Sequence, residues 1–240
     1  YSSILDELRK NGGSLSPDTL KSLAVEVFGH TSRYDAAIYG YLRDYYKAEA
    51  ASDKFPSQLS LVFEKVQDLR YGENPHQQAA FYREKGKSKG LINLKQLQGK
   101  ELSFNNILDL NSAFELAREF KDPAAVVVKH NNPCGAAEDK VLSKAYLAAW
   151  KCDTLSAFGG IVALNRKMDL KTAKLILKSG FLECIIAPGF EEGVIALFKD
   201  KKNLRLLELN EPENTSDADL KRVSGGLLVQ DKDSATLDMN

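Results

Sequence analysis

The sequence predicts an α/β protein in which helices cover both faces of a sheet. From about residue 59 onward, short apolar runs typical of strands alternate with amphipathic segments typical of helices. One run, residues 124–128, is apolar at every position, as in a strand that is covered on both faces of a parallel sheet. Ligands of such sheets bind at the carboxyl ends of the strands, so we expect the functional site at that edge.

Composition excludes several classes of protein. The 240 residues include 33 Lys and Arg against 33 Asp and Glu, so nucleic-acid binding driven by bulk positive charge is not expected, although a local anion site is allowed. No apolar run reaches the roughly 18 residues of a membrane span. Cys134, Cys152 and Cys184 are too widely spaced for a disulfide framework or a zinc clamp, which favours a cytoplasmic protein without a metal.

Residues 1–58 are expected to form a short helical segment followed by a linker. Ser16, Pro17 and Asp18 have the chemistry of a helix start, and Thr31 can cap a second helix. Both helices carry an apolar stripe at helical spacing, which we interpret as a surface to be buried. The small and polar stretch 47–60 marks the boundary to the second unit.

Residues 59–240 are expected to form the α/β domain. Asn106 can cap a helix, and the Asp122-Pro123 step stops it. The predicted strands are 59–63, 79–84, 124–128, 161–164, 184–187, 204–209 and 223–230, and the predicted helices are 106–120, one through Tyr146 and Trp150, 170–178 and 191–198. Loops are expected at 69–78, 131–137 and 153–160, and the polar stretch 210–222 is expected to be a surface loop.

Lys129 and His130 follow the buried strand directly, at the lip of the predicted sheet. A lysine there can bind an anion or transfer protons, and a neighbouring histidine is the usual general base near neutral pH. The alternative is a lysine that extends to water beside a histidine that bonds a backbone carbonyl. The position directly after a buried strand favours the catalytic interpretation. Asn132 belongs to the following turn, where Gly135 permits close approach of the backbone to a ligand.

Three further segments carry candidate binding groups. Arg70 and Tyr71 suit a phosphate and a planar ring, although the segment 70–76, which includes His76, also has the composition of a plain turn. The backbone around Gly159 can cradle a phosphate or simply lead into a strand. Glu183 can accept hydrogen bonds from ribose hydroxyls or be merely solvated.

Neither a metal site nor a cysteine nucleophile is expected. The three histidines lack zinc-ligand spacing, so no metal site is expected. Cys134 is interpreted as a small buried residue rather than a nucleophile.

Six segments follow one another along the chain: LRYGENPHQ, LSFNNILDLNSA, VVVKHNNPCGAA, DTLSAFGGIVAL, ECIIAPGFEE and VSGGLLVQDKD. Together, and in this order, they resemble the bifunctional AICAR formyltransferase/IMP cyclohydrolase family. The resemblance runs over roughly residues 60–232 and covers the first half of the family's AICAR transformylase domain. Residues 1–47 resemble the last helices of its cyclohydrolase domain.

The resemblance implies an activity and an architecture. The family transfers a formyl group from 10-formyltetrahydrofolate to the 5-amino group of the nucleotide AICAR and then closes the product to IMP. Its transformylase is a three-layer α/β/α, cytidine-deaminase-like fold without zinc, in an intertwined homodimer with shared active sites. A second repeat that carries much of the folate site is missing here, so this chain alone is expected to be inactive or nearly so.

The resemblance also implies roles for single residues. Lys129 matches the family's catalytic lysine, and His130 matches the histidine that takes the proton from the attacking amine. The positions that match AICAR contacts are Arg70, Tyr71, Asn106, Gly159 and Glu183, with His76 and Asn132 as further candidates. Two alternatives stay open: a nucleotide deaminase-like domain with or without zinc, and a non-catalytic nucleotide-binding or assembly module.

Overall fold

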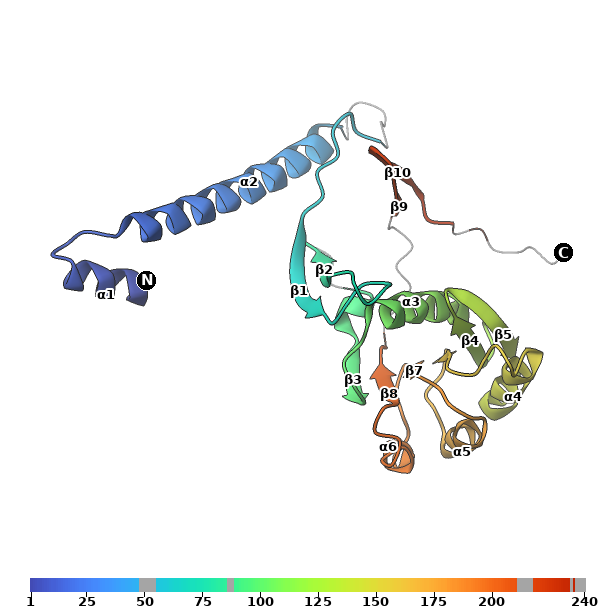
Figure 1. The fold of residues 1–240 in the computed structure, drawn as a ribbon. Helices are drawn as coiled ribbons and strands as arrows, with labels where there is room; N and C mark the ends of the chain where they lie inside the picture. Colours follow the sequence, from blue (N-terminus) through green and yellow to red (C-terminus); the bar gives the residue numbers. More distant parts are fainter. Residues whose placement is uncertain (48–54, 86–88, 211–217, 234, 236–240) are drawn as a thin grey trace. The chain divides into compact units, whose positions relative to one another are not determined.

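The computed structural model describes residues 1–47, 55–85, 89–210, 218–233 and 235 (Figure 1). The chain divides into two compact units, residues 1–63 and residues 64–240. Part of the predicted linker, residues 48–54, lies outside the described residues. Within the described ranges, no helix combines the length and the apolar composition that a membrane crossing requires.

The first unit contains helices α1, Ser2–Lys10, and α2, Pro17–Lys47. As predicted, Ser16 caps the start of α2, where its Oγ accepts the Thr19 amide at 3.2 Å. The predicted second helix start at Thr31 is wrong. The Thr31 hydroxyl bonds the Phe28 carbonyl at 3.3 Å, within a helix that continues unbroken.

Large apolar side chains of α2 are exposed. Phe28 is 75% exposed and Tyr41 is 67% exposed. These residues lie in a helix, as expected, but the expected burial of their stripe is not seen among the described residues.

The second unit opens with a two-stranded sheet of β1, Phe63–Leu69, and β2, Ala79–Glu84. β2 was predicted, whereas the strand predicted at 59–63 begins only at Phe63. β1 is largely polar, and Arg83 pairs with Glu64 across the two strands at 2.9 Å. The apolar alternation at 59–63 therefore did not locate this strand. Part of the strand's stability comes from cross-strand charge pairing, which apolar alternation does not reveal.

The central sheet of the described chain has six strands in the order β3-β8-β7-β6-β4-β5. Their bounds are Lys95–Gln98, Arg205–Glu208, Cys184–Ala187, Ile161–Leu164, Ala124–Lys129 and Asn132–Glu138 in that order. β6, β7 and β8 run parallel, but β4 is antiparallel to both β5 and β6, and β3 is antiparallel to β8. The sheet is therefore mixed, and the expectation of a parallel environment for 124–128 is wrong.

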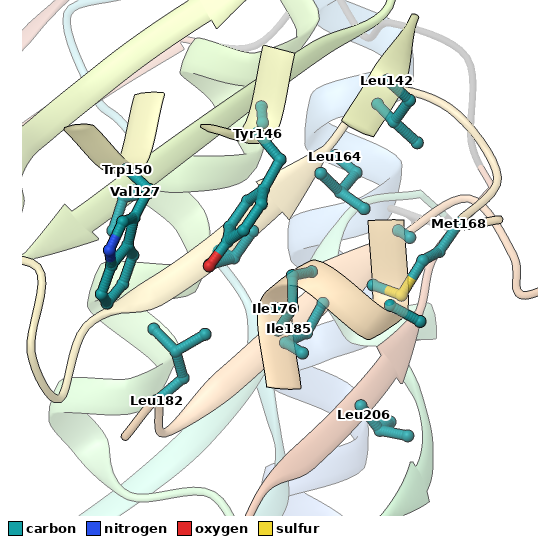
Figure 2. Close-up of a cluster of buried hydrophobic side chains, with 14 of the residues drawn as sticks. Val127, Leu142, Tyr146, Trp150, Leu164, Met168, Ile176, Leu182, Ile185 and Leu206 are labelled. Atoms are coloured by element: carbon teal, nitrogen blue, oxygen red, sulfur yellow. The ribbon is translucent and has the colours of Figure 1, made fainter. Parts of the chain in front are cut away.

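Helices cover both faces of this sheet, as predicted. One face packs against α3, Phe104–Arg118, and the other against α4, Leu142–Cys152, α5, Leu170–Lys178, and α6, Val194–Leu197. Residues alternate along β4, so that Val126 belongs to the α3 side and Val127 to the α4 side. On the α4 side, Tyr146 and Trp150 project from α4 toward the strands (Figure 2).

Several element bounds differ from the predictions. Ser103, not Asn106, caps α3. The Ser103 Oγ accepts the Asn106 amide at 3.2 Å, and the Asn106 side chain accepts the Ser103 amide at 3.1 Å, which is a capping box. α3 ends at Arg118, and α6 spans only Val194–Leu197.

Three strands and a 3-10 helix were not predicted. The expected loop 131–137 is mostly strand β5, and β3 follows a short 3-10 helix, Leu91–Asn93. Residues 218–222 of the expected surface loop belong to strand β9, Ala218–Val223, which pairs antiparallel with β10, Gly226–Asp231. Residues 211–217 of that loop lie outside the described residues.

Candidate functional site

Lys129 and His130 lie where β4 turns directly into β5. Lys129 pairs with Asn132, so the turn consists of two residues, His130 and Asn131. Their φ angles are 53° and 60°, which is the conformation of a type I′ hairpin turn. Left-handed backbone costs a residue with a side chain about 1 kcal/mol or more. A turn without glycine therefore needs support from its surroundings.

Asp109 of α3 supplies much of that support. Its two carboxylate oxygens accept the backbone amides of His130, at 3.1 Å, and Asn131, at 2.7 Å. The Ser112 hydroxyl donates to the Asn131 side chain at 3.1 Å, and the Asn132 amide group donates to the His130 carbonyl at 2.8 Å. The backbone of His130 is held on both sides, while its exposed imidazole makes no hydrogen bond to another described residue.

Lys129 is tied to the loop that precedes β6. Its Nζ donates to the carbonyl oxygen of Phe158 at 2.8 Å. The next amide, that of Gly159, donates to the Phe181 carbonyl at 2.8 Å. Asp153 closes the same loop by accepting from the hydroxyl and the amide of Ser156, and these bonds lower the pKa of the Asp153 carboxyl. The ammonium group is therefore fixed beside a structured backbone loop.

Glu183 lies just before β7 and belongs to a partly buried polar network. Its Oε2 accepts from the Asn106 side chain at 2.8 Å and from the Arg205 guanidinium at 3.5 Å. The Arg205 side chain is only 13% exposed, and its Nε donates to the carbonyls of Lys100 and Glu101. The carboxylate is thus oriented by the first turn of α3 and by the start of β8.

Arg70 and Tyr71 follow β1, and the Arg70 guanidinium lies 5.6 Å from the centre of the Tyr71 ring. They line a pocket of about 330 Å³ together with Ser103 and Arg205, among other residues. The loop is joined to the start of α3 where the Asn105 side chain donates to the Glu73 carbonyl at 3.3 Å. His76 is exposed in this loop and makes no hydrogen bond to a described residue.

Lys129, Gly159 and Glu183 lie at one edge of the sheet, but not at the expected kind of edge. Lys129 lies at the carboxyl end of β4, whereas Gly159 and Glu183 precede the amino ends of β6 and β7. Antiparallel pairing of β4 with β6 brings these opposite ends together. The Glu183 amide donates to the Gly160 carbonyl at 3.0 Å, which joins the Glu183 network to the loop beside Lys129.

Gly135 has a packing role that was not predicted from the sequence. A Cβ at this position would overlap the carbonyl oxygen of Ala149 and lie 2.8 Å from the Cβ of Cys152. The absence of a side chain therefore lets α4 pack closely on β5.

The whole chain matches one protein family. The family described as "AICARFT/IMPCHase bienzyme" matches residues 1–240. The chain belongs to the AICARFT/IMPCHase bienzyme family.

Two curated relatives agree with this family. The bifunctional purine biosynthesis protein PurH of Thermoanaerobacter sp. (strain X514) is 51% identical over 240 residues, which are 100% of this chain and 46% of the relative. The protein of the same name from Acetivibrio thermocellus is 49% identical over 246 residues, again covering 100% of this chain and 46% of the relative. The chain thus spans about half the length of the curated relatives it matches.

Similarity to solved structures is weak. Two forms of RibD from Acinetobacter baumannii match with TM-scores of 0.33 and 0.32, at 15% and 13% identity. The matches cover 43% and 42% of this chain and 35% of the RibD chain in each case. Such TM-scores support no inference.

In this member of the AICARFT/IMPCHase bienzyme family, the thiols of Cys134 and Cys184 stay protonated at neutral pH. Burial raises the pKa of the Cys134 thiol and raises that of Cys184 to about 12. In the described part of the chain, no three His, Cys, Asp or Glu side chains lie together as ligands for a metal ion. The chemical groups available at the edge are therefore an ammonium, an imidazole and an oriented carboxylate.

Two supporting residues, Asp109 and Arg205, were missed from the sequence, although each had a signal. Asn106, Asp109 and Ser112 recur at intervals of three along the predicted helix, which places polar groups on one face. Arg205 opens an apolar strand in register with Cys184, beside Glu183, so opposite charges stand at the starts of neighbouring parallel strands.

Proposed function

We propose that this chain is part of an AICAR formyltransferase with IMP cyclohydrolase activity in the full-length protein. The enzyme would transfer the formyl group of 10-formyltetrahydrofolate to the 5-amino group of AICAR and then cyclise the product to IMP. Membership of the AICARFT/IMPCHase bienzyme family supports the reaction. The observation that carries the proposal for this chain is the meeting of Lys129 and His130 with the Glu183 network at one edge of the sheet.

The reaction needs a base and a cation. The exocyclic amine of AICAR is a weak nucleophile, and its attack on the formyl carbon forms a C–N bond and a tetrahedral oxyanion. His130 would accept the amine proton, and the Lys129 ammonium would stabilise the oxyanion, each worth roughly 10²-fold or more in rate. Collapse then breaks the bond from the formyl carbon to N10, and the N10 atom of tetrahydrofolate takes up a proton.

The nucleotide would be bound by the groups on both sides of Lys129. Only Oε2 of Glu183 is used by Asn106 and Arg205, so Oε1 can accept hydrogen bonds from ribose hydroxyls. Arg70 and Tyr71 would contact the phosphate and the planar ring across the pocket that they share with Arg205. Asn106 and the Gly159 backbone are further contacts in this proposal. Asn132 would act through the His130 carbonyl, and the role of His76 stays open.

The architecture of the whole protein is part of the proposal. Residues 1–58 would be the end of the cyclohydrolase domain with its linker, and residues 59–240 the first repeat of a cytidine-deaminase-like transformylase domain that works without zinc. We also propose a cytoplasmic homodimer with shared active sites, and no nucleic-acid or membrane partner. The 46% coverage of both relatives supports the assignment of the chain to part of a longer protein. The exposed apolar stripe of α2 supports a homodimer interface. The 240-residue chain alone is expected to have little or no activity.

The proposal is tested on a full-length protein that contains this sequence. Formation of tetrahydrofolate from AICAR and 10-formyltetrahydrofolate is measured for the wild type, Lys129→Ala and His130→Ala, with Lys144→Ala on the exposed side of α4 as the control lysine. We expect each site variant to lose roughly 10²-fold in kcat and the control to keep its rate. Undiminished turnover in both site variants would refute the assignment of roles.

The two alternatives predict other outcomes. Stoichiometric zinc together with ammonia release from a nucleotide would favour a deaminase-like domain. AICAR binding by calorimetry and assembly by light scattering, without any turnover in the full-length protein, would favour a non-catalytic module.

A further inference from the structure

We propose that Asp109 is the positioning residue for His130, a role that rests on the proposed formyl transfer. The carboxylate would hold the His130–Asn131 turn in its left-handed conformation and thereby aim the imidazole at the reacting amine. Asp109 itself would not touch the substrate. The proposal starts from the two hydrogen bonds that one carboxylate makes to two successive backbone amides.

The first argument concerns the amides of the turn. The ladder between β4 and β5 closes with the pair Lys129 and Asn132, so the amides of His130 and Asn131 have no partner in the strands. Each donates to a different oxygen of Asp109, at 3.1 Å and 2.7 Å. Hydrogen bonds to an ionised carboxylate are among the stronger ones in proteins, and two from one group fix an orientation as well as a position.

The second argument concerns the conformation that these bonds maintain. Both turn residues have positive φ angles, although neither is glycine. His130 needs its side chain for chemistry and so cannot be exchanged for a residue that suits this backbone better. The support has to come from outside the turn, and α3 provides it on a rigid base, because the neighbouring Leu110 and Ala113 are completely buried against the sheet.

The third argument concerns what Asp109 does not support. Lys129 is held by the β4 ladder and by the Phe158 carbonyl, and Glu183 is held by Asn106 and Arg205. Loss of the Asp109 carboxylate leaves all these contacts in place. The change should therefore reduce kcat through a displaced imidazole and leave the binding of AICAR nearly unaltered.

The test compares variants of a full-length protein that contains this sequence. We expect Asp109→Ala to lower kcat by about 10- to 100-fold, the loss typical of a catalytic group displaced by about 1 Å, with KM for AICAR within about threefold. Asp109→Asn keeps only one accepting oxygen and should lie between the alanine variant and the wild type. Adding Asn131→Gly to Asp109→Ala should recover at least about threefold in kcat, because glycine adopts positive φ without steric cost.

A matched control separates positioning from general stability. Asp139 also accepts a backbone amide within its own loop, that of Val141 at 2.9 Å, but at the opposite end of β5. Asp139→Ala should keep the wild-type kcat. Hydrogen exchange followed by mass spectrometry on peptides that span 124–138 should be faster at the turn in Asp109→Ala only.

The possible results separate this proposal from the proposed function. A wild-type kcat in Asp109→Ala, or an equal loss in Asp139→Ala, would overturn the positioning role. If Asp109→Ala does not fold, a wild-type kcat in Asp109→Asn would overturn it instead. If the wild type transfers no formyl group, the proposed function fails, and unchanged hydrogen exchange in Asp109→Ala would then overturn the support of the turn as well.

Discussion

Replacement of Gly135 by alanine tests whether this glycine serves packing or a ligand. The added Cβ would overlap the Ala149 carbonyl oxygen, lie 3.0 Å from the Ala149 carbonyl carbon and 2.8 Å from the Cys152 Cβ. Two of these three atoms are backbone, so α4 itself has to move, since no side chain can simply rotate away. Overpacking of this kind costs typically about 1–3 kcal/mol, and we expect the upper end because the obstacle is a helix backbone.

This magnitude translates into a measurable thermal shift. A loss of about 3 kcal/mol in a unit of this size corresponds to a decrease of about 6–12 °C in the unfolding temperature. Gly189→Ala is the matched control, because its Cβ would meet nothing closer than 3.6 Å and its backbone is not left-handed. Thermal unfolding followed by circular dichroism should separate the two variants clearly.

One combination of results would refute the packing explanation. It is an unfolding temperature for Gly135→Ala within about 2 °C of the wild type, together with a raised KM for AICAR in the full-length protein. That outcome would restore the interpretation that Gly135 admits a ligand.

Further predictions concern Tyr146 and Arg205. The Tyr146 hydroxyl is buried without a hydrogen-bond partner among the described residues, so Tyr146→Phe should leave the free energy of unfolding unchanged or raise it by about 1 kcal/mol in urea titrations. Burial also raises the pKa of Tyr146 to about 12, above the ordinary value of 10.0, so wild-type stability should fall as pH rises through this window, and Tyr146→Phe should fall less steeply. Arg205→Met should raise KM for AICAR about tenfold, because Glu183 loses its contact with the guanidinium. An unchanged KM would contradict the proposed role of the Glu183 network in AICAR binding.

The layers of the fold were predictable because burial leaves a direct mark on the sequence. Ala124 through Val128 are all buried, and the helix stripes that cover them follow helical spacing. Strand direction leaves no such mark, because a strand covered on both faces is apolar whether its neighbours run parallel or antiparallel. The antiparallel pairing of β4 therefore could not be derived from residues 124–128 alone.

The strand β5 was missed for a related physical reason. Asn131, Asn132, Pro133 and Gly135 are all residues that favour turns, so their composition indicated a loop. Only His130 and Asn131 form the turn, and the following residues enter the ladder at once, with a register irregularity beside Pro133. Tertiary packing of α4 on β5 overrides the local preference here.

Lys129 was singled out by its position directly after a buried strand, whereas Glu183 was singled out by the family resemblance. The partners of both residues were not predicted. Asp109 and Arg205 act across the fold, through contacts between residues 21 or 22 positions apart in the chain. Such contacts depend on the pairing of β4 with β5 and of β7 with β8, which the sequence pattern did not supply.

The reversal of β4 explains why one edge can collect these groups. In a fully parallel sheet, the end of β4 and the starts of β6 and β7 would lie at opposite edges. Because β4 runs against β6, the Lys129 ammonium meets the loop before β6, and the first turns of α3 reach the same edge through Asn106 and Asp109. The residues that start α3 and support the hairpin thus also orient the candidate site. Variants at Asp109 should therefore lower kcat without a comparable loss of stability. Variants at Gly135 should lower stability and leave kcat unchanged.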